Sequence, residues 1–430
     1  MKQRAFLVFL IVSILVLFGP HTLLAKDIVI LSQFPLSGPH GQLAEFGWGF
    51  IDTWNWFNNE AGGVGGKKVK WFMEDFRYDA TVEVANYNRY CAEYSKDEFL
   101  MATGYTTGAL KPLSKKVNEE EKMPWADGSF SEEIFGKEGG PSKYPYYYSL
   151  GATYADQMKV LVKWIADTYK GQGKPKVAFV NSPTGYGRDG LPEAISYAKE
   201  KGVDVVAQIE YPYSATDATN ECMEIRKSKA QYIIYHGYTG QQSVTALFLK
   251  TLKKISPKTQ FTGTHYLGGI LTFLVNREAY DGVVFAACWP PMDALPRSAA
   301  SMDNPMVKLM HDMAKKYRPQ EYEMGLKGGM RDVTLYFIGA LYAFVVQQGL
   351  LEAHKAGDLS REGINKAMEN MVWDFKGMFD GKTFSYRNHT VPMVRIYQAS
   401  VKMVEVGGKK VPTGKWTSIS DWINTTEIKW

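Results

Sequence analysis

Cysteine is scarce in this chain: there are three among 430 residues, an odd number that cannot be fully paired. Cys91 and Cys222 fall at helical spacing among apolar residues, and Cys288 lies in an apolar, strand-like run. This pattern favours small core-facing side chains over a disulfide. The sequence therefore does not indicate a fold held together by disulfides.

Metal-ligand and catalytic motifs are also lacking. The seven histidines are scattered without metal-ligand spacing, and no cysteine joins them. The chain has no G-x-S-x-G, no H-E-x-x-H and no paired-carboxylate signature, which weakens an enzymatic interpretation. We therefore expect no metal, no cofactor and no catalysis.

An excess of one charge is lacking too. The 50 basic and 45 acidic residues give a net charge of +5, which falls to +3 without Lys2 and Arg4. This weak and evenly spread charge argues against a nucleic-acid partner. Hydrophobic residues make up 45% of the chain and charged residues 22%, which is typical of a soluble globular protein. The length suits two domains.

Long apolar runs are absent except near the N-terminus. Lys2 and Arg4 form a basic segment, Ala5 to Phe18 is almost wholly apolar, and Ala25 offers a small residue for cleavage. This layout predicts a signal peptide over residues 1–25 and export of the mature chain. The alternative is an uncleaved membrane anchor, although the run is short for a span of roughly 20 residues. No cysteine lies at the cleavage point, so we expect no lipid anchor.

Strand-like and helix-like segments alternate along the mature chain, which is the pattern of α/β folds. A first run has strands at Ile28–Phe34, Val69–Asp75 and Phe99–Thr103 and helices at Gly41–Ala61 and Ala80–Tyr94. A second run has strands at Lys176–Asn181, Val203–Tyr211, Tyr232–His236 and Gln260–Thr264 and helices at Leu191–Lys201, Thr219–Lys227 and Gln241–Lys253. A long helix, Asp332–His354, follows, and the last strands are Val391–Gln398 and Val401–Val406. Two such runs predict two doubly wound parallel-sheet lobes.

Ligands of open α/β sheets bind at the carboxyl ends of the strands, where helix N-termini and loop N–H groups converge. This rule selects six loops: Pro35–Gly41, Gly104–Gly108, Asp127–Ser131, Ser182–Arg188, Gly237–Gly240 and Thr264–Gly268. Several are rich in Gly, Thr and Tyr, which approach a ligand closely, donate hydrogen bonds or stack on it.

These loops also carry a family pattern. The matching strings are Pro35–Pro39 (PLSGP), Asn58–Gly66 (NNEAGGVGG), Glu74-Asp75, Gly104–Thr107 (GYTT), Asn181–Gly187 (NSPTGYG), Tyr235–Tyr238 (YHGY) and Gln260–Gly263 (QFTG). Each string alone is weak, but their joint order over the whole mature chain resembles the branched-chain amino acid type of periplasmic substrate-binding protein. The resemblance implies a type I, Venus-flytrap fold with three crossings between the lobes, near Gly151, Pro290 and Ser385. Lobe I would then hold residues 26–151 and 290–385, and lobe II residues 152–289 and 386–430.

The resemblance also implies a function: a periplasmic protein, expected to be monomeric, that carries a small molecule to the membrane permease of an ABC importer. In the family, the loop at Thr106-Thr107 and the backbone near Ser129 hold the ligand carboxylate, and Tyr186 and Tyr238 close over the ligand from the second lobe. Thr106, Thr107 and Ser129 would serve equally well as turn and cap residues.

His265 is the main departure from the family, because amino-acid binders carry there an acidic residue that pairs with the ligand's ammonium group. An imidazole cannot replace that carboxylate. With Tyr105 and Phe130 as further aromatic walls, we expect a small carboxylate or amide with an apolar body, including aromatic ones. In the alternative, Glu132 or Asp189 supplies the ammonium contact and the ligand is an ordinary amino acid, with His265 a structural residue.

Three other interpretations stay open. Gly185–Gly190 fits G-x-G-x-x-G, with Glu210 at a plausible ribose distance, but Asn181–Thr184 separates the strand from the first glycine, where a dinucleotide site needs a tight turn. A ligand-sensing receptor or regulator on the same fold would lack the signal peptide or need a later membrane span. A periplasmic enzyme would need convergent titratable groups that the sequence does not reveal.

Overall fold

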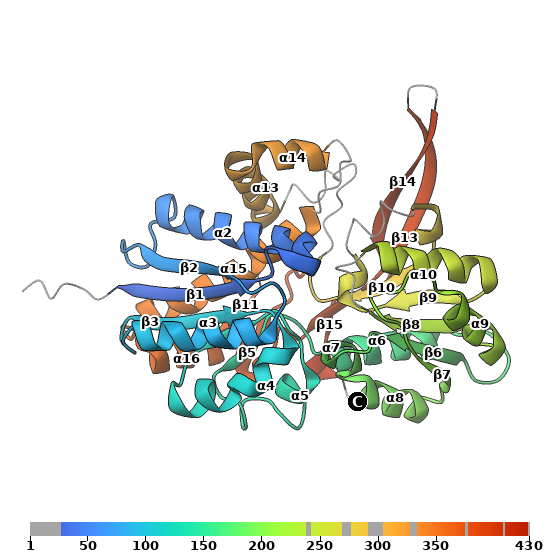
Figure 1. Cartoon of the computed structure of the whole chain (residues 1–430), viewed down its shortest axis with the longest axis horizontal. Coiled ribbons are helices and arrows are strands. Elements are labelled where there is room, and N and C mark those ends of the chain that lie inside the picture. The colour runs from blue at the N-terminus through green and yellow to red at the C-terminus, as the bar shows by residue number, and fades with distance from the viewer. Residues whose placement is uncertain are drawn as a thin grey trace, which may run out of the picture.

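A computed structural model describes residues 27–237, 242–268, 277–290, 304–326, 333–374, 377–406 and 409–428. These residues form two α/β lobes side by side, each built on its own sheet (Figure 1). The predicted signal peptide, residues 1–25, lies outside the described residues, and so does Tyr238.

The first sheet is wholly parallel, with strand order β2-β1-β3-β4-β5. Its strands are β1 (Ile28–Phe34), β2 (Val69–Asp75), β3 (Phe99–Gly104), β4 (Trp125–Asp127) and β5 (Tyr147–Ser149). Ile28 and Ile30 of β1 join a core with α2 (Ala44–Asn59) and α15 (Val333–Lys355), whereas Val29 and Leu31 join a core with α3 (Ala80–Glu93) and α4 (Thr107–Lys115). Helices on both faces explain why the four successive residues Ile28–Leu31 are all apolar.

The second sheet has the order β14-β13-β10-β9-β8-β6-β7. Its parallel strands are β6 (Lys176–Asn181), β7 (Asp204–Glu210), β8 (Tyr232–His236), β9 (Gln260–Gly263) and β10 (Val284–Ala287). Helices α6 (Tyr154–Thr168) and α8 (Leu191–Glu200) pack on one face, and α9 (Thr219–Ser228) and α10 (Gln242–Ile255) on the other. Cys222 and Cys288 are buried in these cores, Cys91 is half-buried on α3, and all three are free thiols.

The C-terminal strands differ from the expectation. One long strand, β13 (Met393–Val406), replaces the two expected ones, and β14 (Lys409–Ser418) pairs with it antiparallel. The pairing continues through Ala399 and Ser400, the residues between the two expected strands, because Ala399 faces Trp416 and Ser400 faces Lys415. The resulting ribbon projects beyond the second lobe (Figure 1). β15 (Ile423–Asn424) closes on the start of β13.

The expectation that no long apolar run follows the N-terminal one was wrong. Among the described residues, helix α15 is long and apolar enough to cross a membrane, but 83% of its apolar window is buried inside the protein. It lies against α2 at two glycines. A methyl group on Gly49 would overlap the carbonyl of Tyr336, and one on Gly339 would overlap the carbonyl of Phe46. The two backbones therefore touch, which only glycine permits.

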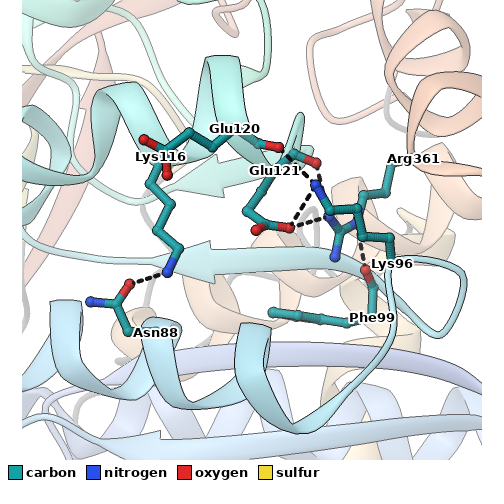
Figure 2. A network of polar contacts seen from close by, with 7 residues as sticks. All are labelled: Asn88, Lys96, Phe99, Lys116, Glu120, Glu121 and Arg361. Atoms are coloured by element: carbon teal, nitrogen blue, oxygen red, sulfur yellow. Dashed lines mark hydrogen bonds and ion pairs between the residues drawn. The ribbon is translucent and has the colours of Figure 1, made fainter.

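Helix α16 (Arg361–Glu369) fixes the later part of the chain to the first sheet (Figure 2). The buried Arg361 donates to the carbonyl of Phe99 at 2.7 Å, to the carbonyl of Glu121 at 2.8 Å and to its carboxylate at 2.9 Å. Lys96 pairs with the same carboxylate at 3.4 Å. The chain thus returns to the first sheet after β10 and enters the second again at β13, while the lobe boundaries stay a prediction.

Candidate ligand site between the lobes

The polar end of the candidate site comes from two loops of the first lobe. The Thr107 and Ser129 hydroxyls, from the loops after β3 and β4, lie 2.7 Å apart. Tyr154, at the start of α6, donates to Ser129 Oγ at 3.5 Å. Thr106 is the N-cap of α4, and its side chain accepts from the N–H of Gly108 at 3.3 Å. The structure therefore brings Thr107 and Ser129 together, and it gives Thr106 the cap role that the sequence left open.

Aromatic rings from both lobes lie next to these hydroxyls. Phe130 stacks on Tyr266 with centroids 5.9 Å apart and planes 2° apart. Tyr186 meets Tyr154 edge-on at 5.0 Å and Tyr266 at 6.1 Å. Its ring also lies 4.5 Å from that of His236. Phe130 and Tyr186 therefore belong to one aromatic cluster, which Tyr154 and Tyr266 complete.

Tyr105 lies between the core of the first lobe and the aromatic cluster, where its phenol faces that of Tyr266. Its ring packs on Phe34 at 5.6 Å and on Phe46 at 5.4 Å, inside the first lobe, and reaches the edge of Tyr78 at 6.5 Å. Tyr105 thus supports the cluster from the side of the core. The expected role of Tyr238 falls outside the described residues.

Direct contacts hold the lobes against each other. Tyr266 donates from the second lobe to the carbonyl of Gly128 in the first at 2.9 Å. The Asp189 carboxylate accepts from the backbone N–H of Glu132 at 2.8 Å and of Glu133 at 3.4 Å, so it caps a short helix of the opposite lobe. Burial raises the pKa of Asp189 to about 6 and that of Glu132 to about 7. The structure is thus a closed form, in which Asp189 is engaged by protein groups.

His265 has a defined tautomer. Its Nδ1 accepts the backbone N–H of Cys288 at 3.1 Å, so in the neutral ring the proton resides on Nε2. Burial lowers the pKa of His265 to about 3, which keeps the ring neutral. Nε2 has no hydrogen-bond partner among the described residues, and the ring lies 5.7 Å from Phe130. His265 therefore offers a donor, whereas an ammonium group needs an acceptor.

The loop Gly185–Gly190, which fits the dinucleotide-binding motif, is not arranged as a dinucleotide site. Glu210, which would hold a ribose, forms an ion pair with Arg188 at 2.6 Å. A methyl group on Gly187 would overlap Ser182, whereas one on Gly185 would meet nothing within 4 Å. The loop instead presents Tyr186 toward Tyr154 and the first lobe.

Sequence reasoning missed Tyr154 and Tyr266, although weak signals existed. Tyr266 lies in the selected loop Thr264–Gly268, directly after His265. Tyr154 opens the helix that follows the first predicted crossing, near Gly151. Neither residue is part of a motif, so only their contacts identify them.

The comparisons agree with this architecture. A family described as periplasmic binding protein matches residues 30–409, and the chain belongs to this family. It is a type I periplasmic binding protein, a substrate-binding component of ABC transporters, which confirms the predicted fold class and family. No curated protein matches the chain.

Solved structures with the same fold differ in what they bind. A branched-chain amino acid ABC transporter protein from Thermus thermophilus with bound valine is 21% identical, with a TM-score of 0.74 over 93% of this chain and 97% of that one. A fatty acid ABC transporter substrate-binding protein from Thermomonospora curvata is 18% identical, with a TM-score of 0.71 over 94% and 95%. A solute-binding protein from Rhodopseudomonas palustris HaA2 in complex with p-hydroxybenzoic acid is 17% identical, with a TM-score of 0.69 over 93% and 98%.

Proposed function

We propose that this substrate-binding protein is exported through a signal peptide over residues 1–25. It captures a small carboxylate or amide with an apolar body and delivers it to the permease of an ABC importer. The observation that carries the ligand class is the pairing of the Thr107 and Ser129 hydroxyls with the rings of Phe130, Tyr186 and Tyr266. Hydroxyls donate to a carboxylate or carbonyl, and the rings pack on an apolar body.

Binding would act through a hinge equilibrium. The cluster draws on both lobes, so a ligand contacts all of it only when the lobes are closed, and binding shifts the population toward the closed form. The hinge would be the three crossings near Gly151, Pro290 and Ser385. No bond chemistry is required.

The amino-acid alternative has less support in the contacts. An ammonium group needs an acceptor, and the neutral His265 offers a donor instead. Asp189, one of the two alternative partners, already accepts backbone N–H groups across the lobes, whereas Oε2 of the other, Glu132, is buried without a hydrogen-bond partner among the described residues. An ammonium group buried without an acceptor costs several kcal/mol.

Two experiments test this proposal. Mass spectrometry of small molecules released from denatured protein identifies any co-purified ligand. A thermal-shift screen then compares 4-hydroxybenzoate, 4-hydroxybenzamide, octanoate, leucine, isoleucine and valine. A true ligand at about 100 times its Kd stabilises the protein by about 2.7 kcal/mol. Stabilisation by the amino acids alone would contradict the proposed ligand class.

Variants at Tyr186 connect a positive result to the site. We expect Tyr186→Ala to weaken binding by roughly 1–3 kcal/mol, as for other desolvated aromatic anchors. Tyr186→Phe is the matched control, because it keeps the ring and removes only the hydroxyl that donates to Gly237 at 3.3 Å. Equal affinity in all three proteins would place the ligand elsewhere.

A further inference from the structure

Two buried carboxyl groups lie behind the ligand-facing loops of the first lobe. Glu83 on α3 and Asp127 at the end of β4 are both fully buried. A methyl group on Gly104 would overlap Glu83 Oε1 and lie 2.7 Å from Asp127 Oδ2. The two carboxyl groups therefore approach the same point of the backbone, within a few ångströms of each other.

Each carboxyl group holds one of the two loops. Glu83 Oε1 accepts the backbone N–H of Tyr105 at 3.0 Å, and the Glu83 carboxyl group also accepts that of Thr106. Asp127 Oδ1 accepts the backbone N–H of Ser129 at 2.6 Å. These loops continue directly into the Thr107 and Ser129 hydroxyls, so the pair sets the geometry of the polar end of the site.

No cation offsets the charge of this pair among the residues that the structure describes. The ionisable side chains that face it are the phenols of Tyr78, Tyr105, Tyr147 and Tyr342. Burial raises the pKa of each phenol, so all four stay neutral. Two neighbouring buried carboxyl groups without a countercharge do not both ionise near neutral pH. The pair therefore keeps a proton.

The direction of the shifts agrees with this geometry. Burial, followed by repulsion from Asp127, raises the pKa of Glu83 well above its usual range. Burial raises the pKa of Asp127 to about 7. Above about pH 7 the pair thus carries one negative charge, directly behind the hydroxyls that face the ligand.

We propose that Glu83 and Asp127 are positioning residues that couple ligand affinity to pH. The two carboxyl groups hold both loops and together retain one proton. When an anionic ligand binds, the pair takes up a second proton from solvent. The inference rests on the proposed function, because a neutral ligand does not respond to the charge behind the loops. The complex binds more protons than the free protein, so affinity is highest at low pH. It is lost as the pH rises above about 7, where the free pair gives up the first of its two protons.

Calorimetric titration with 4-hydroxybenzoate tests this between about pH 6 and about pH 9. We expect a nearly constant Kd below about pH 7 and a loss of affinity approaching tenfold per pH unit above it, the limit for one proton taken up. Titrations in buffers of different ionisation enthalpy should show this proton uptake directly. 4-Hydroxybenzamide, which stays largely neutral up to about pH 8, should bind with a pH-independent Kd over that range.

Asp127→Asn is the decisive variant. Its amide oxygen can still accept the N–H of Ser129, but the group that titrates near pH 7 is gone, so we expect a pH-independent Kd for the acid. Glu83→Gln leaves Asp127 in place, and burial still raises the pKa of that carboxyl group, so this variant should keep the loss of affinity with pH. If Asp127→Asn does not fold, the proton uptake of the wild type decides. The same loss of affinity with pH in wild type and Asp127→Asn would overturn the inference.

If neither probe binds at any pH, the proposed ligand class fails, and the pair is tested in the free protein. A carboxyl group whose pKa is raised on folding stabilises the fold at low pH, and that stability is lost as the pH rises toward the folded pKa. We then expect wild type to lose more stability than Glu83→Gln between about pH 4 and about pH 7. Superimposable stability profiles would refute the retained proton.

Discussion

The contact of Asp189 with the opposite lobe allows closure to be tested separately from folding. Asp189 lies after β6 in the second lobe, and its carboxylate accepts the N–H groups of Glu132 and Glu133 in the first lobe, at 2.8 and 3.4 Å. Because they join the two lobes, we expect these bonds to be lost when the lobes open. Removing them therefore destabilises the closed form and leaves each open lobe intact.

The expected effect of Asp189→Ala on ligand binding follows from the energetics of helix caps. Replacing a capping Asp by Ala costs about 0.5–2 kcal/mol. Because the whole cost falls on the closed form, we expect Asp189→Ala to weaken ligand binding about 2- to 30-fold. Asp189→Asn keeps an acceptor oxygen and buries no charge. It should stay within about threefold of wild type.

A cap within one lobe provides the control. Asp79 is the N-cap of α3 and accepts the N–H of Thr81 at 2.8 Å inside the first lobe. Asp79→Ala should lower the free energy of unfolding by about 1 kcal/mol and leave ligand affinity unchanged. Asp189→Ala should instead weaken ligand binding and leave the free energy of unfolding of the ligand-free protein unchanged.

Calorimetry gives the affinity, and small-angle X-ray scattering with and without ligand gives the population of the closed form. The pH dependence has a defined sign, because burial raises the pKa of Asp189 to about 6 in the closed form. Closure is therefore favoured at low pH, and that contribution is lost as the pH rises through about 6. Unchanged affinity and scattering in Asp189→Ala would refute the role of this contact.

Three further predictions concern folding and export. Gly49→Ala forces a methyl group into the carbonyl of Tyr336 and should cost at least about 1–3 kcal/mol in thermal unfolding, whereas Gly185→Ala enters open space and should be neutral. Arg361→Ala leaves the Glu121 carboxylate without its closest partner and should cost about 3 kcal/mol in urea unfolding; an unchanged midpoint would contradict this. Intact-mass analysis of periplasmic protein should give an N-terminus near Lys26, and full-length chain in the membrane fraction would refute processing.

The sheets could be predicted from the sequence because their signal is local. The strands Val69–Asp75, Lys176–Asn181 and Tyr232–His236 have the predicted bounds. They are short runs followed by turn or loop residues, the pattern of strands in βαβ units. The expected helix Gly41–Ala61 instead begins with a 3-10 turn, Gly38–Leu43, before α2. Element ends depend on single hydrogen bonds, so they are harder to predict than the elements themselves.

The strand β14 lacked any local signal. It contains a proline, a glycine and several lysines, residue types that are depleted in strands, and its pairing with β13 supplies the hydrogen bonds that propensity does not. Edge strands tolerate proline and lysine, which explains why this composition is compatible with the observed ribbon.

The candidate site was only partly predictable, because the topology of the sheets brings its parts together. The rule that ligands bind at the carboxyl ends of strands selected the loops of Thr107, Ser129 and Tyr186, which the structure places near one another, while their contact with a ligand stays a prediction. It could not find Glu83, which lies in the first turn of an ordinary amphipathic helix and reaches its loop across 22 residues of sequence. A residue of this kind is recognised only by what its carboxylate contacts.

If the ligand binds at the proposed site, the same contacts predict which ligands it would reject. The polar end has hydroxyls that either donate or accept, and behind them stand carboxyl groups already bonded to backbone N–H groups. Beside the stacked rings, His265 is held as a donor by the backbone of Cys288. An amino-acid ligand would have to bury its ammonium group against a donor, whereas a carboxylate or carbonyl oxygen would satisfy that donor. Discrimination of this type comes from an unsatisfied polar group and is stronger than what a difference in apolar size can provide.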